Sequence, residues 1–552
     1  MQQRFRRALC LATALFLALG LSLGCTAAVK ENNDTTKETA QTAEASEPVG
    51  SVQADGSEPL SEPPSGDRPE GTPPDGMGEP PSGDRPDGTP PGGMGQPPSG
   101  GRPDGTPPNG MGEPPSGGRP DGTPPGGMGQ PPSGGPGGGP GGPGGSSGDI
   151  DYKGAVEITS ADSQSGQTYA TDVSDESALL IATGDAVTIT DPTVTKSGSS
   201  NGGDSCNFYG LNAAVLCKDG AQVTITGGEI TSDASGANGI FCYGGNGGQN
   251  GAAGDGTTVT VTGTVITTTG SGSGGIMTTG GGVTYANDLT VTTSGQSSAP
   301  IRTDRGGGTV YVNGGVYTSN GLGSPAIYST AEIYVSNASL TSNLSEGVCI
   351  EGKNSIELTD CDLTANNTQM NSNATFLDTI MIYQSMSGDA DSGTSAFTMT
   401  GGKLTSRNGH VFHVTNTSAI ITLSGVEIVN EDGEGVLLSV CDDGWSGAGN
   451  VATLNARGQT MEGLLLVGSD ATLTLNLTEG SVFTGTVSGA ITNAKGDAVS
   501  TEVGAVHVTV DGTSIWVLTG DTYIASFTGD ASSIVANGYT LYVDGVALTG
   551  TK

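Results

Sequence analysis

The feature that most limits the possible folds of this chain is a series of short apolar segments that recurs between Ala178 and Val467. Examples are ALLIA, NGIFC, PAIYS and GVLLS, and their central apolar residues lie 21 to 36 positions apart, with several spacings near 25. A repeat of this length indicates a solenoid in which each copy forms one coil. We expect these residues to be equivalent, inward-facing positions of successive coils: Leu179, Val215, Ile240, Ile276, Ile301, Ile327, Val348, Ile380, Val411, Val436 and Leu464.

Between these segments lie runs in which apolar and polar residues alternate, such as QVTITGGEIT, TVYVNGGVYT and AIITLSGVEI. Alternation rich in Val, Ile and Thr is typical of strands with one buried face. Several strands and turns per repeat predict an all-β chain, a parallel β-helix of about eleven or more coils over residues 150–489. Residues 490–552 alternate again and carry more aromatic side chains, so we expect the last coils and a C-terminal cap there.

The composition agrees with a solenoid and excludes some partners. Only 33% of the 552 residues are hydrophobic and 4% are aromatic, which is little for one compact globule but enough for a narrow inner column. The formal net charge of −37 argues against nucleic acid as a partner, because phosphates bind to basic patches. The acidity also suits Ca²⁺ at carboxylate clusters, although solvation of an extracellular domain is the simpler explanation.

The N-terminus has the features of a secretion signal. Three arginines precede an apolar segment, residues 8–23, which ends next to Cys25. The sequence LSLGC resembles the lipobox of bacterial lipoproteins, which implies that residues 1–25 are a signal peptide and that Cys25 carries the lipid. Ordinary cleavage near Ala27 is the alternative.

Two segments separate this signal from the strands. Residues 26–61 are polar, acidic and aperiodic, which predicts a disordered linker. Within residues 62–149 a 17-residue unit repeats, beginning with EPPSGDRPEGTPPDGMG. Frequent proline and glycine prevent helices and ladders, so we predict a disordered, semi-extended stalk. The expected location is therefore outside the cell, with a lipid anchor in the outer face of a bacterial membrane and the strands exposed at the cell surface.

Six cysteines follow Cys25, and none of them forms a C-x-x-C pair that would suggest zinc. Cys217 and Cys242 are 25 residues apart, and each lies two positions after an inward residue, so they should stack inside neighbouring coils. Stacked strands bring such side chains close enough for a disulfide of marginal geometry. A reduced ladder of buried cysteines is the alternative, and both remain open.

One candidate binding patch follows from strand geometry. Residues one and three positions after an inward residue point outward, so Arg302, Tyr328 and Glu351 should share one face of the solenoid. Aromatic rings stack on sugars, and arginine or carboxylate groups bind sugar hydroxyls and uronates, so this face predicts a glycan site. A surface network of ion pairs is the alternative. The members of the predicted patch are Arg302, Asp304, Arg305, Tyr328, Glu351, Lys353 and Tyr383.

Three further groups lie in or near turns. Asp389 and Asp391 occupy the glycine-containing turn YQSMSGDADSG and can supply oxygen ligands to Ca²⁺, although an ordinary acidic turn is the alternative. Trp445, in CDDGWSG, is either a sugar platform or a packed turn residue. His410 and His413 lie three positions apart on one strand, so we expect them to face opposite sides and do not assign them as metal ligands.

The segments GLNAAVL, SAPIRTDRGGG, SPAIYSTAEI and EGKNSIELTDCDLT resemble the pectate-lyase-like superfamily, and in particular surface lipoproteins of Gram-positive bacteria with this fold, which implies a right-handed parallel β-helix. The likeness covers about residues 150–552. Some of these lipoproteins are named carbohydrate-binding, which implies an adhesin or a binder of extracellular polysaccharide or of glycans on host or neighbouring cells.

The same resemblance implies an enzymatic alternative. Polysaccharide lyases on this fold pair Ca²⁺-binding aspartates with a catalytic Arg or Lys, so Arg302 or Lys353 would be the base and Asp304 or Glu351 would bind the metal. The sequence contains no contiguous lyase motif. We therefore favour a non-catalytic binding protein, with a Ca²⁺-dependent polysaccharide lyase or a purely structural surface rod as alternatives.

Overall fold

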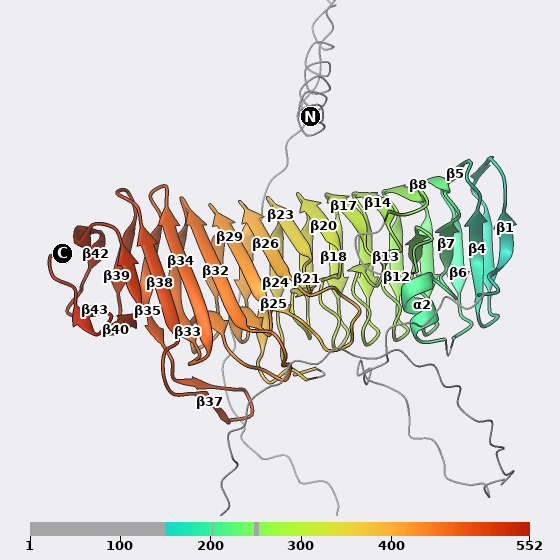
Figure 1. Ribbon diagram of the computed structural model, residues 1–552. Helices are drawn as coiled ribbons and strands as arrows, with labels where there is room; N and C mark the ends of the chain where they lie inside the picture. The colour runs from blue at the N-terminus through green and yellow to red at the C-terminus, as the bar shows by residue number, and fades with distance from the viewer. Residues whose placement is uncertain (1–149, 201, 248–252, 372) are drawn as a thin grey trace, which may run out of the picture. The chain divides into compact units, whose positions relative to one another are not determined.

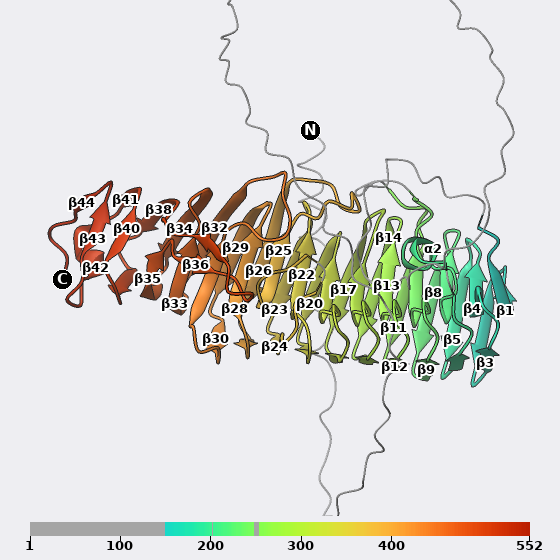
Figure 2. The same ribbon diagram turned by 90° about the horizontal axis from the view of Figure 1, so that it is seen from below.

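A computed structural model describes residues 150–552 with the exception of 201, 248–252 and 372, and these residues form a parallel β-helix (Figures 1 and 2). The solenoid architecture predicted from the repeat is confirmed. The predicted signal peptide, Cys25, the linker and the stalk lie outside the described residues. Among the described residues, α2 (Asp204–Tyr209) is a short insertion, and no helix there is long and apolar enough to cross a membrane.

Three long parallel sheets run along the solenoid, with 15, 14 and 10 strands. Each complete coil adds one strand to each sheet. The first sheet consists of β1 (Lys153–Ile158), β4 (Glu176–Ala182), β7 (Val215–Lys218), β10 (Ile240–Tyr243), β13 (Ile276–Thr279), β16 (Ile301–Thr303), β19 (Ile327–Ser329), β22 (Val348–Glu351), β25 (Asp378–Tyr383), β28 (His410–Thr415), β31 (Val436–Val440), β33 (Thr460–Val467), β35 (Val482–Ser488), β39 (Ile515–Leu518) and β42 (Ile534–Val535).

The second sheet runs from β2 (Asp162–Ser165) to β41 (Ser526–Thr528), and the third from β3 (Thr168–Thr171) to β30 (Glu427–Asn430). The third sheet therefore ends first, and later coils are built from the other two sheets. Strands of the second sheet that matter below are β11 (Thr258–Thr262), β14 (Gly282–Asn287), β17 (Gly308–Asn313), β20 (Glu332–Ser336), β23 (Ser355–Thr359) and β29 (Ser418–Ser424).

A residue with positive φ begins the corner between the second and third sheets, and in some coils a second glycine with positive φ, such as Gly228, follows it. Asp288, Asn337 and Asp360 hold this position with φ of 51°, 56° and 51°, and Gly227 holds it with φ of 67°. Aspartate, asparagine and glycine tolerate this left-handed conformation better than other residues. The recurring small or polar residue after each second strand is thus what turns the chain into the third sheet.

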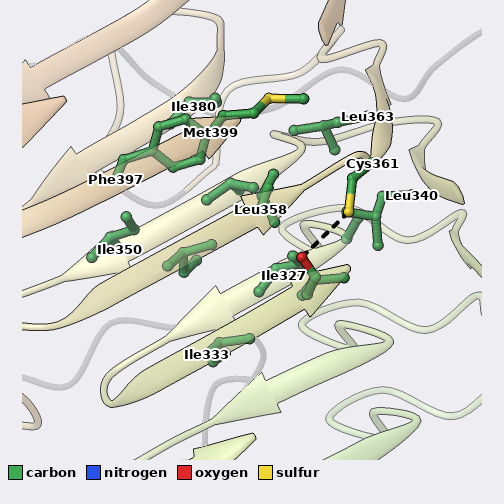
Figure 3. Close-up of a cluster of buried hydrophobic side chains, with 14 of the residues drawn as sticks. Ile327, Ile333, Leu340, Ile350, Leu358, Cys361, Leu363, Ile380, Phe397 and Met399 are labelled. Carbon is green, nitrogen blue, oxygen red and sulfur yellow. Dashed lines mark hydrogen bonds between the residues drawn. The ribbon is translucent and has the colours of Figure 1, made fainter. Parts of the chain in front are cut away.

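Inward-facing apolar residues from all three sheets fill the inside of the solenoid (Figure 3). Ile327 and Ile350 come from the first sheet, Leu358 from the second and Leu340 from the third, and each is fully buried. Cys361 takes part in the same packing, and its thiol donates to the Val335 carbonyl oxygen at 3.5 Å. Alternation along each strand thus produces continuous apolar rows along the solenoid axis.

The predicted inward positions are correct from Leu179 to Val411 and wrong at Val436 and Leu464, and Val411 is not the equivalent of Ile380. Ile380 pairs with Phe412 rather than with Val411, because two consecutive residues of β28, Val411 and Phe412, both belong to the core. In β31 the consecutive residues Leu437 and Leu438 likewise both belong to the core. One extra inward residue moves every neighbouring side chain to the other face. Val436 and Leu464 consequently pack in a separate cluster outside the main core.

The tail continues the solenoid beyond β35. Strands β39 and β42 extend the first sheet, and Trp516 of β39 is fully buried with its indole N–H donating to the Gly485 carbonyl oxygen at 3.0 Å. An antiparallel pair, β36 (Ile491–Thr492) and β37 (Ala498–Ser500), interrupts the parallel order and projects beside the coils (Figure 1). Its residue Ile491 covers the outer cluster that holds Val436.

Replacement of the inward Ile350 by alanine should reduce the free energy of unfolding by about 2–5 kcal/mol, because it removes buried methylene groups and leaves a cavity. The matched control is Ile420→Ala on β29, whose side chain is 40% exposed and should change stability by no more than about 0.5 kcal/mol. Denaturant midpoints measured at equal protein concentration compare the two variants. Equal losses would contradict the assigned inside and outside of the coils.

Candidate functional site

The predicted patch lies on the outer face of the first sheet, where its side chains are brought together. Arg302 of β16 pairs in register with Tyr328 of β19, and Glu351 of β22 pairs with Tyr383 of β25. The guanidinium of Arg302 lies 5.7 Å from the centre of the Tyr328 ring. The stacking of successive coils therefore aligns residues that are more than twenty positions apart in sequence.

Glu351 is the centre of this patch and is only 2% exposed. Its Oε2 accepts hydrogen bonds from the Tyr328 hydroxyl at 2.5 Å and the Tyr383 hydroxyl at 3.1 Å. Its Oε1 accepts from the hydroxyls of Ser385 and Ser387, the latter at 3.3 Å. Four neutral donors hold the carboxylate, but burial still raises the pKa of Glu351 above its usual range.

Arg302 and Asp304 form a buried ion pair, with 2.7 Å between Nη2 and Oδ2. Burial is the largest influence on Asp304 and raises its pKa to about 6, although the neighbouring arginine acts in the opposite direction. Arg302 also donates to the Ser297 carbonyl oxygen at 3.2 Å and to Asn207 Oδ1 at 3.4 Å. The pair is enclosed by its own partners and has little contact with solvent.

Two insertions cover the patch, and sequence analysis identified neither as a cover. The helix α2 supplies Asn207 and Phe208, and the Arg305 guanidinium lies 4.3 Å from the centre of the Phe208 ring. The turn after β25 supplies Asp389, whose Oδ1 lies 2.5 Å from Arg305 Nη2. The long spacing between the first and second repeats, from Leu179 to Val215, was the available signal for α2, because an extra segment there has to lie outside the coil.

The two aspartates predicted as calcium ligands are each next to a cation. Asp389 contacts Arg305, and Asp391 Oδ2 lies 2.8 Å from Lys353 Nζ. Within the described part of the chain, no group of three or more His, Cys, Asp or Glu side chains is placed to hold a metal ion. These carboxylates therefore do not fit a calcium site in this arrangement, since Ca²⁺ takes six to eight oxygen ligands. Calcium binding stays a prediction.

Trp445 packs against the patch rather than presenting a free ring. It is 7% exposed, and its ring centre lies 5.0 Å from that of Tyr383 at an interplanar angle of 55°. It shares a small apolar cluster with Cys349 and Met381. Of the two alternatives for this residue, the structure has the packed turn tryptophan.

Cys217 and Cys242 stack on neighbouring strands β7 and β10, as predicted, and both are free thiols. Each is fully buried in the solenoid, and burial raises the pKa of Cys217 well above its usual range. The structure thus has the reduced ladder rather than the disulfide.

The expectation that His410 and His413 face opposite sides is wrong. Each Nδ1 lies 2.7 Å from the hydroxyl oxygen of Ser439, because the two consecutive inward residues between the histidines return both rings to the outer face. His413 Nε2 lies 3.3 Å from Asp443 Oδ2, and both side chains are fully buried. Burial lowers the pKa of His410 to about 3, so this ring is neutral at ordinary pH.

This histidine network fastens loops to the first sheet. The other carboxylate oxygen of Asp443 accepts from the backbone N–H and the hydroxyl of Thr375, both at 2.7 Å. The contacts Ser439–His413–Asp443 link the same residue types as the nucleophile, base and acid of a serine hydrolase, but Ser439 is fully buried. A nucleophile has to reach its substrate, so we assign this group a structural role.

A ladder of three outward-facing tyrosines on the second sheet, two of them exposed and one half-buried, was not identified from the sequence. Tyr285, Tyr311 and Tyr334 pair in register on β14, β17 and β20 (labelled in Figure 1). Successive ring centres are 5.1 Å apart, with interplanar angles of 9° and 12°. Tyr285 is 43% exposed and Tyr311 39%. The signal was present: a tyrosine recurs at the outward position of GVTYAN, GTVYVN and EIYVS.

Polar side chains flank this tyrosine ladder. Asn287, Asn313 and Ser336 form a parallel row two positions further along each strand. Asn313 Oδ1 accepts hydrogen bonds from Asn337 Nδ2 at 2.9 Å and from the Ser336 hydroxyl at 3.1 Å. The second sheet thus presents an aromatic row beside a row of amides and hydroxyls. In the described part of the chain, the side-chain hydrogen bonds of these residues stay within the sheet and its corners.

Replacement of Glu351 by glutamine should change how stability depends on pH. Because the pKa of Glu351 is raised in the folded state, the wild-type carboxyl favours folding fully below its unfolded pKa, about 4.3, and this contribution is lost as pH rises through the folded pKa. Denaturant midpoints from pH 4 to pH 8 should therefore shift in favour of Glu351→Gln as pH rises.

Glu357→Gln, which neutralises an exposed carboxylate on β23, is the control for the loss of one charge. A constant difference between wild type and Glu351→Gln across this pH range would show that the carboxyl is not destabilised by burial.

The cysteine ladder predicts slow thiol chemistry in the native protein. An alkylating reagent should leave Cys217 and Cys242 unmodified until the protein is unfolded, because the thiols are buried and the thiolate is the reactive form. Peptide mass mapping after unfolding without reductant should then show both residues alkylated. Modification that requires prior reduction would indicate the disulfide instead.

No family model matches the chain, and no curated protein or solved structure matches it either. The parallel β-helix fold and its side chains are therefore the basis for a functional assignment. Function has to be inferred from the side chains that the coils present.

Proposed function

We propose that this protein is a non-catalytic, lipid-anchored surface protein that binds extracellular polysaccharide, and that the tyrosine ladder is its binding surface. The observation that carries the proposal is the exposure of Tyr285 and Tyr311, with the half-buried Tyr334 continuing the same stacked row. Soluble proteins seldom leave contiguous aromatic groups in water without a binding role. Lipid anchoring at Cys25 and a stalk that carries the coils away from the membrane complete the proposal.

The chemistry of this surface suits sugars. Parallel rings 5.1 Å apart cover much of one another's faces, so the ladder presents ring edges and phenol hydroxyls outward. Ring edges carry partial positive charge and attract sugar oxygens, and a phenol hydroxyl can both donate and accept a hydrogen bond. The neighbouring amides of Asn287 and Asn313 add both kinds of hydrogen-bonding group.

The predicted patch around Glu351 has less support as the binding surface. Its charged groups are already paired with one another, and the turn after β25 and α2 lie over it. A glycan would have to displace these contacts. The lyase alternative meets the same difficulty, because Arg302 and Lys353, its candidate bases, are each in an ion pair with an aspartate.

Replacement of Tyr311 by alanine should weaken binding to the polysaccharide that the wild-type protein retains by about tenfold or more, equivalent to about 1.4 kcal/mol, because it removes the middle of the ladder. The measurement is affinity electrophoresis in gels that contain different soluble polysaccharides. Stability should change little, because the side chain points away from the core.

The matched control is Tyr523→Ala. Tyr523 is also exposed and stacks on Tyr542 with ring centres 4.6 Å apart, but it belongs to the small sheet near the C-terminus. Retention that survives Tyr311→Ala, or that falls equally in both variants, would contradict the proposal. Release of an unsaturated product that absorbs ultraviolet light would instead favour the lyase alternative.

A further inference from the structure

We infer that the ligand of the tyrosine ladder is an uncharged, extended, β-1,4-linked polysaccharide chain that lies parallel to the solenoid axis, with one sugar residue on each coil. This inference rests on the proposed function and names its substrate class and direction. Three features of the second sheet carry it: the repeat of the ladder, the charge at one of its ends, and its short length.

The repeat comes from the fold. Strands of neighbouring coils are about 4.8 Å apart, and the ring centres of Tyr285, Tyr311 and Tyr334 follow at 5.1 Å. An extended β-1,4-linked pyranose chain advances by nearly this interval per sugar, and its straight axis keeps successive sugars in step with successive coils. An α-1,4-linked glucan curves away from a straight row and loses this match after the first contact.

The rows beside the ladder repeat at the same interval. Asn287, Asn313 and Ser336 pair in register on one side of the tyrosines. Each coil therefore offers a sugar one phenol and one amide or hydroxyl at the same relative position. A chain that runs across the coils would meet this set only once, whereas a chain along the axis meets it three times.

The charge at one end of the ladder selects against acidic chains. Glu332 lies beside Tyr334, whose hydroxyl is 3.5 Å from Oε2, and Glu357 takes the position after Tyr334 on the next coil. Both carboxylates are exposed. A polyuronate laid along this row would place its own carboxylates against them, and like charges this close repel. The surface therefore suits an uncharged chain rather than pectate.

The ladder is three residues long. Thr260 precedes Tyr285 on β11, and Glu357 follows Tyr334 on β23. Affinity should consequently increase with chain length up to about the number of coils that contribute a tyrosine, and then stay level, because further sugars pass beyond the aromatic row.

The test is calorimetric titration of the full secreted chain with β-1,4-linked oligosaccharides of glucose, mannose and N-acetylglucosamine, each from two to six residues long. We expect at least one series to bind, with affinity rising to three or four residues and then constant. Maltohexaose and oligogalacturonate should bind at least tenfold more weakly. Equal binding of either, affinity that does not depend on length, or no binding by any β-1,4-linked series would overturn the inference.

A gain-of-function variant sharpens the test. Glu357→Tyr should extend the ladder by one coil, move the plateau one sugar further and strengthen binding of the longest oligosaccharide about fivefold, the change that corresponds to about 1 kcal/mol. Glu357→Gln is the matched control, because it removes the same charge without adding a ring. An unmoved plateau in Glu357→Tyr, with the variant folded, would contradict one sugar per coil.

Failure of the inference can be separated from failure of the proposed function. If a polysaccharide is retained and Tyr311→Ala abolishes retention, but neither the length series nor Glu357→Tyr behaves as expected, only the direction and class of the ligand are wrong. If Tyr311→Ala leaves retention unchanged, the ladder is not the binding surface. A dimer in light scattering that Tyr311→Ala dissociates would identify a second copy as the occupant and overturn both.

Discussion

The in-register stacking of parallel strands is the interaction on which the rest of this structure depends. Each strand pairs with its equivalent in the next coil, so backbone hydrogen bonds and side chains repeat together along the axis. Inside, this repetition joins Ile327, Val348 and Ile380 into one apolar row. Outside, it joins residues distant in sequence into surfaces, and every candidate site described above is such a row or is built upon one.

The repeated side chains are covered on the outer face of the first sheet and exposed on the outer face of the second. On the first sheet, insertions fold back over the row, and the charged residues satisfy one another beneath Asn207, Phe208 and Asp389. Such a buried network specifies the position of the insertions, and separating one ion-pair partner would leave the other charged and buried. On the second sheet no such cover engages the tyrosines among residues 150–552 as far as the structure describes them, and the rings of Tyr285 and Tyr311 remain in contact with solvent. Exposure, rather than charge, distinguishes the surface suited to a ligand.

Sequence patterns predicted the axis and the faces of the solenoid well where the coils are regular. Alternation identified the inward residues as far as Ile380 and placed Arg302, Tyr328 and Glu351 on one face, because a strand has a period of two and the repeat fixes which coil each residue joins. The prediction failed at β28 and β31, where an added inward residue shifts the period without any sign in composition. The opposite placement of His410 and His413 failed for the same reason.

The sequence by itself determined that this chain stacks strands into a solenoid and which residues turn inward, since both follow from local alternation and the repeat length. Only the tertiary structure decided which outward residues meet water. Whether Glu351 is covered and Tyr311 is exposed depends on where α2 and the turn after β25 fold back, and those contacts join segments far apart in sequence. No periodic pattern encodes such contacts, because insertions interrupt the repeat and pack according to the shape and charge that they meet.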